Sequence, residues 1–207
     1  MNLLKLGTGA AGVAGAGALG TYYSGVFSTN ENTIREKLKK DRWTVLEDSK
    51  TEHKSHWNTV LGKYKEKHTG NTNLTESQLK DICKKLLNSE DDKNYEEARR
   101  YCVVPRKISE RLIDLNLQLL DTTNGNSPNN KNQTQWTSLA TKYKTSGTGN
   151  KELDGLTASS ISDENTNWTN LREKCKTVSE KDHWSEKYSE LVDNSKTWCT
   201  LQGFNNV

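Results

Sequence analysis

Four cysteines, Cys83, Cys102, Cys175 and Cys199, are the residues of this 207-residue chain whose types and spacing most clearly suggest chemistry. Thiols can form disulfides, bind zinc or act as nucleophiles. The sequence has no Cys-x-x-Cys pair, and no histidine is close to any of the four, which argues against zinc. Two interpretations remain open: disulfides, for which three pairings are possible, and buried thiols that pack as small hydrophobic side chains.

The sequence between the cysteines favours a bridge within each half of the chain. The turn-forming stretch NSEDDKN lies midway between Cys83 and Cys102, so two helices joined there would hold both thiols at similar heights. Such a bridge would stabilise the fold by roughly 3 kcal/mol. In the second half the expected turn, SEKD, is not midway between Cys175 and Cys199, and an extra bend near DNS would be needed.

The other candidates for chemistry are weaker. His53 and His56 lie three residues apart and would share one face of a helix, which makes a metal-dependent hydrolase an alternative function. His68 is a weak third ligand. The stretch GTGAAGVAG resembles a phosphate-binding loop, but no strand precedes it and no Lys-Ser/Thr pair ends it. We therefore predict a non-enzymatic protein with no cofactor and no metal.

The sequence pattern around these residues occurs twice in the chain. WNTVLGKYKEKHTGN begins at Trp57, and WTSLATKYKTSGTGN begins at Trp136 with Trp, Lys-Tyr-Lys and Gly-Asn in the same register. In each half a Leu-basic-x-x-Cys-Lys block and then an aromatic-Cys pair follow in the same order. Five ordered blocks indicate an internal duplication, with loops that differ in length.

Apolar side chains recur at the helical spacing i, i+3, i+4, i+7 along most of the polar body. The stretch TESQ from Thr75 predicts a capping box, and a stripe from Ile108 to Leu119 behind Pro105 predicts a longer helix. No useful alternating strand pattern occurs, so we predict an all-α fold. Large rings should supply much of its small core: Trp57, Tyr64, Trp136, Tyr143, Trp168, Trp184 and Trp198.

The N-terminal segment differs from the rest of the chain. After Lys5, 25 residues from Leu6 to Asn30 carry no charge, whereas about 20 residues can span a bilayer. Tyr22, Tyr23 and Phe27 then resemble an interfacial aromatic belt. We predict a membrane-anchor helix that contacts lipid through residues 6–27. A cleaved secretory signal, giving a secreted protein, and a flexible soluble tail are the alternatives.

Glycine and alanine predominate in this segment, so its transfer into lipid gains little free energy. Gly12, Ala16 and Gly20 form a stripe of small residues that would allow close packing against another helix. The basic residues after the segment favour a cytoplasmic body by the positive-inside rule. A single N-terminal span and the cysteines beyond it favour a body outside the cell, which is the orientation that we predict.

Composition limits the partners and the size of the core. Only 31% of residues are hydrophobic, so the core must be thin, and such a core usually needs cross-links. Lysine and arginine number 30 against 27 acidic residues, and the signs are interspersed, which excludes a nucleic-acid partner. We predict four segments: 1–30 anchor or signal, 31–120 first helical module, 121–135 linker, 136–207 second helical module.

The short Met-led start before KLGTGAAGVAGAGALG, the Lys/Asn-rich body, the Trp-led helices and the Cys-Lys positions resemble the large paralogous families of uncharacterised proteins in haemotropic mycoplasmas. Such families are regarded as membrane-associated or surface-exposed and antigenically variable. The resemblance implies a single-pass cell-membrane protein that acts as an antigen or contacts a host or self protein. It provides no catalytic or binding residues. The alternative is a tethered interaction protein that faces the cytoplasm.

Overall fold

The computed structural model describes residues 31–123, 131–161 and 168–206, and within them the fold is all-α, as predicted. No described helix combines the length and the apolar character that crossing a bilayer requires. The predicted anchor, including Gly12, Ala16, Gly20 and the lipid-contacting residues 6–27, lies outside the described residues.

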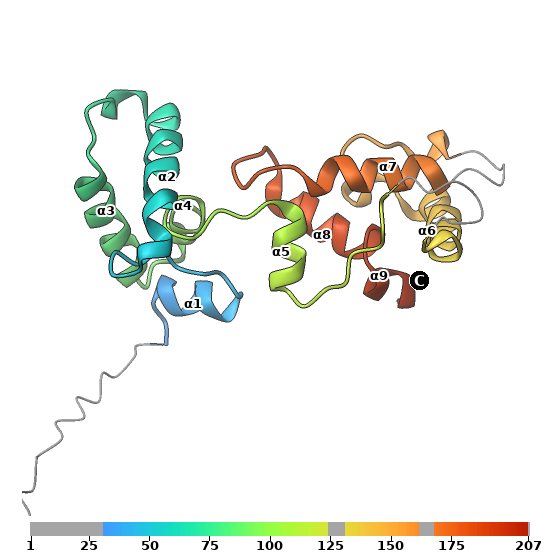
Figure 1. Ribbon diagram of the computed structural model, residues 1–207, viewed down its shortest axis with the longest axis horizontal. Coiled ribbons are helices and arrows are strands. Elements are labelled where there is room, and N and C mark those ends of the chain that lie inside the picture. The colour runs from blue at the N-terminus through green and yellow to red at the C-terminus, as the bar shows by residue number, and fades with distance from the viewer. Residues whose placement is uncertain (1–30, 124–130, 162–167, 207) are drawn as a thin grey trace, which may run out of the picture.

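The described residues form nine α-helices, which Figure 1 shows as two groups along the long axis. The helices are α1 (Ile34–Lys40), α2 (Lys54–Lys67), α3 (Glu76–Asn88), α4 (Tyr95–Tyr101), α5 (Ile108–Asp114), α6 (Gln133–Ser146), α7 (Trp168–Ser179), α8 (Tyr188–Trp198) and α9 (Leu201–Asn205). Short 3₁₀ turns are η1 (Thr51–His53), η2 (Thr69–Asn71), η3 (Asp92–Asn94), η4 (Gly149–Lys151) and η5 (Ala158–Ser160). The predicted capping box at Thr75 begins α3.

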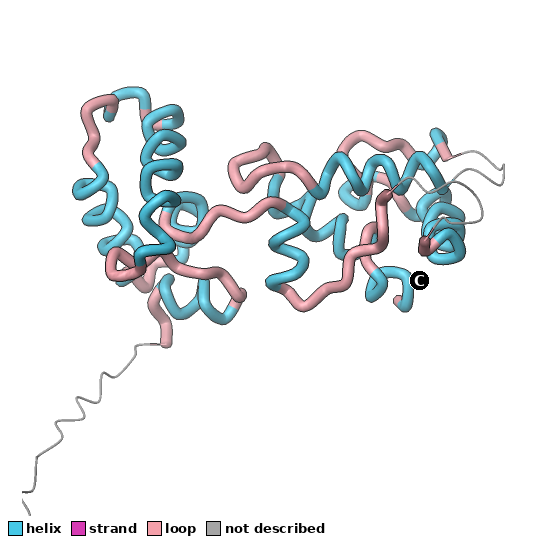
Figure 2. Tube along the Cα trace, in the orientation of Figure 1, coloured by secondary structure: helices cyan, strands magenta, loops and turns pink. Residues whose placement is uncertain are grey.

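The two groups repeat the same pattern of packing. Helix α1 packs against α3 and α4, and helix α5 packs against α7 and α8 in the same way. Within each group the long Trp-led helix, α2 or α6, packs against the helix that carries the first cysteine, α3 or α7. Figure 2 shows a loop that leads from α4 to α5 and joins the groups.

Backbone turns after α1 and α5 have the same geometry. Arg42 and Asn116 both have a φ of 61°, in the left-handed region. This turn lets the N–H of the next residue, Trp43 or Leu117, donate to a carbonyl oxygen inside the helix, at 2.8 Å from Leu38 and 2.9 Å from Leu112. Arginine carries a steric penalty here that Gly would avoid, so the turn is held by the surrounding packing.

A second pair of matched backbone contacts joins the segment after each left-handed turn to the second cysteine of the same group. The N–H of Leu46 donates to the carbonyl of Cys102 at 2.9 Å, and the N–H of Leu120 donates to that of Cys199 at 3.0 Å. These contacts form isolated bridges, Val45 with Val103 and Leu119 with Thr200.

Helix α5 departs from the sequence-based expectations in two respects. The sequence predicts α5 as part of the first module, 31–120, whereas the helix packs against α7 and α8 of the second group. The predicted long helix through Leu119 ends at Asp114, because Asn116 reverses the backbone and Leu119 joins an extended bridge. Of the predicted linker 121–135, residues 124–130 lie outside the described residues, and α6 begins at Gln133.

Two disulfides are present, Cys83–Cys102 and Cys175–Cys199, with Cα atoms 5.4 Å and 5.6 Å apart. No bend interrupts α8 near DNS, because the helix continues to Trp198. The connection from α7 to α8 spans residues 180–187 and is longer than the expected SEKD turn. Helix α8 is longer than α4, so it starts farther from Cys199 than α4 starts from Cys102. The end of α8 nevertheless brings Cys199 to Cys175.

Each group has an aromatic pair at the centre of its core. Tyr64 packs edge-to-face on Tyr101, and Tyr143 packs edge-to-face on Trp198, both with ring centroids 4.9 Å apart at 73°. Each pair joins the Lys-Tyr-Lys tyrosine to the aromatic residue before the second cysteine. Such pairs contribute on the order of 1 kcal/mol beyond the area that they bury.

Candidate interaction site at the junction of the two groups

The junction of the two groups is centred on Trp43, which is 8% exposed. The left-handed turn at Arg42 directs the chain so that the Trp43 ring meets residues of the second group. It lies edge-to-face on His183, with ring centroids 5.4 Å apart, and contacts Tyr188 at 6.4 Å. Residues that are far apart in the sequence thus share one buried aromatic cluster.

Arg111 from α5 covers the other face of Trp43. Its guanidinium carbon lies 3.7 Å from the ring centroid, within the range of a strong cation–π contact. Two of its nitrogens donate to the carbonyl oxygens of Asp41 and Arg42. These acceptors are neutral, and Arg111 makes no ion pair with any carboxylate in the described part of the chain. Burial lowers the pKa of Arg111, although the nearby Tyr188 and Asp114 favour its charged form.

His183 is the most buried titratable group of the junction, at 2% exposure. Its Nε2 lies 2.9 Å from the carbonyl oxygen of Arg99, so the neutral ring can donate there. Burial, followed by the charges of Arg99 and Arg100, lowers the pKa of His183 to about 4. Its Nδ1 and the Nη1 of Arg99 have no hydrogen-bond partner among the described residues. At neutral pH the ring is therefore uncharged.

Trp184 and Arg100 make two reciprocal hydrogen bonds across the junction. The indole N–H donates to the carbonyl of Arg100 at 3.1 Å, and the Arg100 guanidinium donates to the carbonyl of Trp184 at 3.2 Å. Nearby, the Tyr188 hydroxyl donates to the carbonyl of Arg106 at 2.8 Å, and burial raises the pKa of that hydroxyl. Trp184, expected within a module core, is half-buried at this junction instead.

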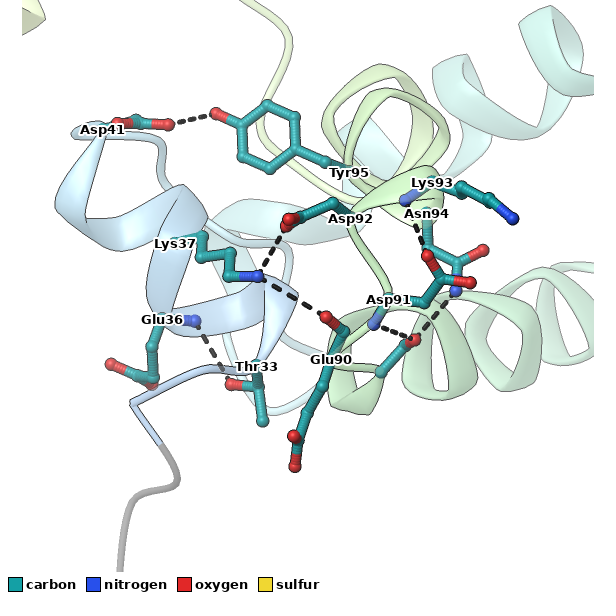
Figure 3. A network of polar contacts seen from close by, with 11 residues as sticks. Thr33, Glu36, Lys37, Asp41, Glu90, Asp91, Asp92, Lys93, Asn94 and Tyr95 are labelled. Atoms are coloured by element: carbon teal, nitrogen blue, oxygen red, sulfur yellow. Dashed lines mark hydrogen bonds and ion pairs between the residues drawn. The ribbon is translucent and has the colours of Figure 1, made fainter.

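An open groove of about 460 Å³ lies beside the junction, between the end of α1, the start of α4 and α8. We call it the junction groove, and its charged lining consists of Lys40, Asp41, Arg42, Glu96, Arg99, Arg111, Asp193 and Lys196. Figure 3 shows how one wall is held: the Tyr95 hydroxyl donates to Asp41, and Lys37 pairs with Asp92 at 2.5 Å. Burial, then Asp41, raises the pKa of Tyr95.

The three acidic residues of the junction groove already have partners. Asp41 accepts from Tyr95, Glu96 pairs with Arg99 at 2.8 Å, and Asp193 pairs with Lys196 at 2.7 Å. Arg111 has only neutral acceptors, so the groove keeps a surplus of positive charge. The chemistry that this arrangement supports is the binding of an anionic group.

The histidines considered for metal binding have other contacts. His53 is buried and its Nδ1 accepts from the Glu47 N–H at 2.9 Å. Its ring centroid is 6.5 Å from that of His56, whose pKa is lowered by burial and then by His53. His68 stacks on Tyr64 at 4.1 Å. Within the described ranges, no three His, Cys, Asp or Glu side chains are placed to hold a metal ion.

The expected core rings, apart from Trp184, are all buried: Trp57, Tyr64, Trp136, Tyr143, Trp168 and Trp198. Several also satisfy their polar atoms. The Trp136 indole donates to the carbonyl of Asp121 at 2.9 Å, and the Trp198 indole donates to that of Lys151 at 2.8 Å. The Tyr143 hydroxyl accepts from the Leu153 N–H at 2.7 Å. These rings therefore position loops as well as filling the core.

The junction residues were not found from the sequence. No motif in the sequence contains Trp43, Arg111, Tyr188 or His183. One signal was present: Trp43 lies outside the two Trp-led blocks, so the duplication gives it no matching tryptophan. Its counterpart in the fold is Leu117, so the two groups carry side chains of very different size at this position.

No protein-family description, curated protein or solved structure matches this chain. The resemblance to the mycoplasma families therefore stays a prediction.

Proposed function

We propose that this chain is a non-enzymatic interaction protein, tethered to a cell membrane through residues 6–27 and displayed on the outer surface as two related helical modules. It would act as an antigen or as a contact for a host or self protein. The observation that carries the proposal is the pair of disulfides. One disulfide cross-links each group internally, at matched positions. Disulfides persist in oxidising compartments and are rare in the cytosol.

The relation between the modules is supported by the matched turns and bridges. Because α1 and α5 occupy equivalent places, we place the start of the second module near Pro105 rather than after residue 120. The stretch 121–135 then lies inside the second module, in the position that the connection before α2 has in the first, and its last residues begin α6 at Gln133. Its length makes it a candidate for the exposed, variable part of the molecule.

Protease treatment of intact cells that express the full chain tests the orientation. Trypsin added outside should cut the lysine-rich body, and an antibody against the C-terminus should lose its full-length band. A cytosolic protein in the same cells must stay intact as the control. If the body is cut only after lysis, the chain faces the cytoplasm, as the basic residues after the segment would favour. Recovery from the medium as a shortened chain would indicate a cleaved signal.

Thiol counting gives an independent test of the compartment. Alkylation of the chain in freshly lysed cells, before any reduction, should leave all four cysteines unlabelled and linked as two peptide pairs. The same sample after reduction is the control, and all four cysteines should then be labelled. Four reactive thiols in unreduced material would contradict display in an oxidising compartment.

A further inference from the structure

A second groove adjoins the junction groove. It has a volume of about 510 Å³ and lies between α6, α8 and α9, and we call it the C-terminal groove. Its three charged residues are all lysines, Lys142, Lys151 and Lys196, and no acidic side chain lines it. Lys142 and Lys151 are exposed and make no ion pair with a described carboxylate. Both grooves have volumes typical of binding sites.

The C-terminal groove has an apolar floor and a fixed wall. The half-buried Leu117 contributes apolar surface, Trp198 lies buried beneath it, and α9 closes one side. Helix α9 lies so close to α8 that a Cβ at Gly203 would be 2.1 Å from the carbonyl oxygen of Thr197. Because glycine alone permits this approach, the wall is part of the folded structure rather than a loosely attached end.

The two grooves meet at Lys196, which lines both. Along the combined surface, lysine and arginine outnumber acidic residues by seven to three. This surplus of four charges exceeds the net charge of +3 that the whole chain carries. The positive charge of the protein is therefore concentrated on this surface, whereas elsewhere the signs nearly balance.

We propose that the joined grooves bind an extended segment of a partner protein that carries alternating carboxylate and apolar side chains. The carboxylates would pair with Lys142, Lys151 and the exposed Arg42 of the junction groove. The apolar side chains would cover the half-buried Leu117, which a sulfated polysaccharide would leave uncovered. This proposal deepens the interaction role proposed above and rests on it for its biological setting.

Fluorescence anisotropy on the full-length oxidised chain in nonionic detergent provides the test. The probe is a short fluorescein-labelled peptide of alternating glutamate and leucine. It should bind, and added salt should weaken the binding because exposed ion pairs are screened. A glutamine–leucine peptide removes the charge and a glutamate–serine peptide removes the apolar side chains, so both should bind at least about tenfold more weakly.

Matched variants locate the site. Lys142→Gln with Lys151→Gln should weaken binding about tenfold, since two ion pairs are lost. Lys85→Gln with Lys176→Gln makes the same change of charge at exposed positions outside both grooves and should leave affinity unchanged. All four side chains are exposed, so folding should be preserved, as circular dichroism can verify.

Three results would overturn the proposal. The first is equal weakening by both double variants, which would indicate non-specific charge attraction. The second is equal affinity for the glutamate–serine peptide. The third is stronger binding of a heparin-derived oligosaccharide or of phosphatidylglycerol vesicles than of the glutamate–leucine peptide. Binding in detergent does not depend on membrane orientation, so this test and the protease test fail independently.

Discussion

Single residues at the junction show what a pattern of apolar spacing leaves out. The buried rings of the core follow from helical periodicity, because a helix must bury its apolar face. Arg111 and His183 do not, since polar residues are expected at the surface and their burial depends on contacts with the other group. Trp43 joins them, with Arg111 at 3.7 Å on one face and the edge of His183 at 5.4 Å.

The buried His183 predicts that stability falls in mild acid. Its pKa is about 4 in the folded protein against 6.5 for an ordinary histidine, so between these values the unfolded state binds more protons. Lowering the pH from about 7.5 to about 5 should therefore cost about 2 kcal/mol of unfolding free energy. Urea unfolding of the oxidised chain at both pH values measures this difference.

His183→Gln is the control for that measurement. Glutamine does not titrate and its amide can still donate to the Arg99 carbonyl, so the variant should lose most of the difference between the two pH values. Carboxylates contribute little above pH 5, because they are already ionised there. An unchanged pH dependence in the variant would show that another group is responsible.

At the scale of elements, the sequence predicts helices and their caps better than their partners. The capping box at Thr75 and the Trp-led helices follow from local rules. The end of α5 at Asp114 and the membership of α5 in the second group do not. Both depend on the turn at Asn116 and on the bridge from Leu119 to Thr200. Asparagine tolerates the left-handed backbone of the turn, but the bridge is a backbone contact without a side-chain signature.

The matched packing predicts where the chain can be divided. A fragment of residues 105–207 should fold, because it keeps α5, whose Ile108 and Leu112 are fully buried beside α7 and α8. A fragment of residues 121–207 should show much less helix by circular dichroism, since removing these side chains exposes the core that they cover. Equal helical content and equal melting of the two fragments would contradict this placement.

The two disulfides should contribute similar stability. They close loops with sequence separations of 19 and 24, for which the loss of chain entropy in the unfolded state corresponds to roughly 3 kcal/mol each. Replacing Cys83 and Cys102 together by alanine, or Cys175 and Cys199 together, should therefore lower the unfolding free energy by comparable amounts. Alanine avoids burying a hydroxyl at these positions, which are at most 2% exposed. Chemical denaturation of each variant measures the loss, and a negligible effect of either would show that its bridge is not a staple.

At the scale of the whole molecule, the buried apolar residues of both groups belong to one continuous core cluster. The junction adds specific contacts, including Arg111 on Trp43 and the paired hydrogen bonds of Arg100 and Trp184. Two units that are joined in this way differ from the two modules separated by a linker at 121–135 that the sequence predicts. The junction groove, which residues of both groups line, exists only because the units are held in one arrangement.

The junction therefore predicts that the two groups unfold together. Differential scanning calorimetry of the oxidised chain should show a single transition, because partial unfolding would expose Trp43, Arg111 and His183 at once. Combining Trp43→Ala with Arg111→Ala removes the ring and the guanidinium that bridge the groups, so two transitions should appear. Trp57→Phe, a change in the core of the first group, should lower stability without splitting the transition. A single sharp transition in the junction variant would mean that the shared core alone couples the two groups.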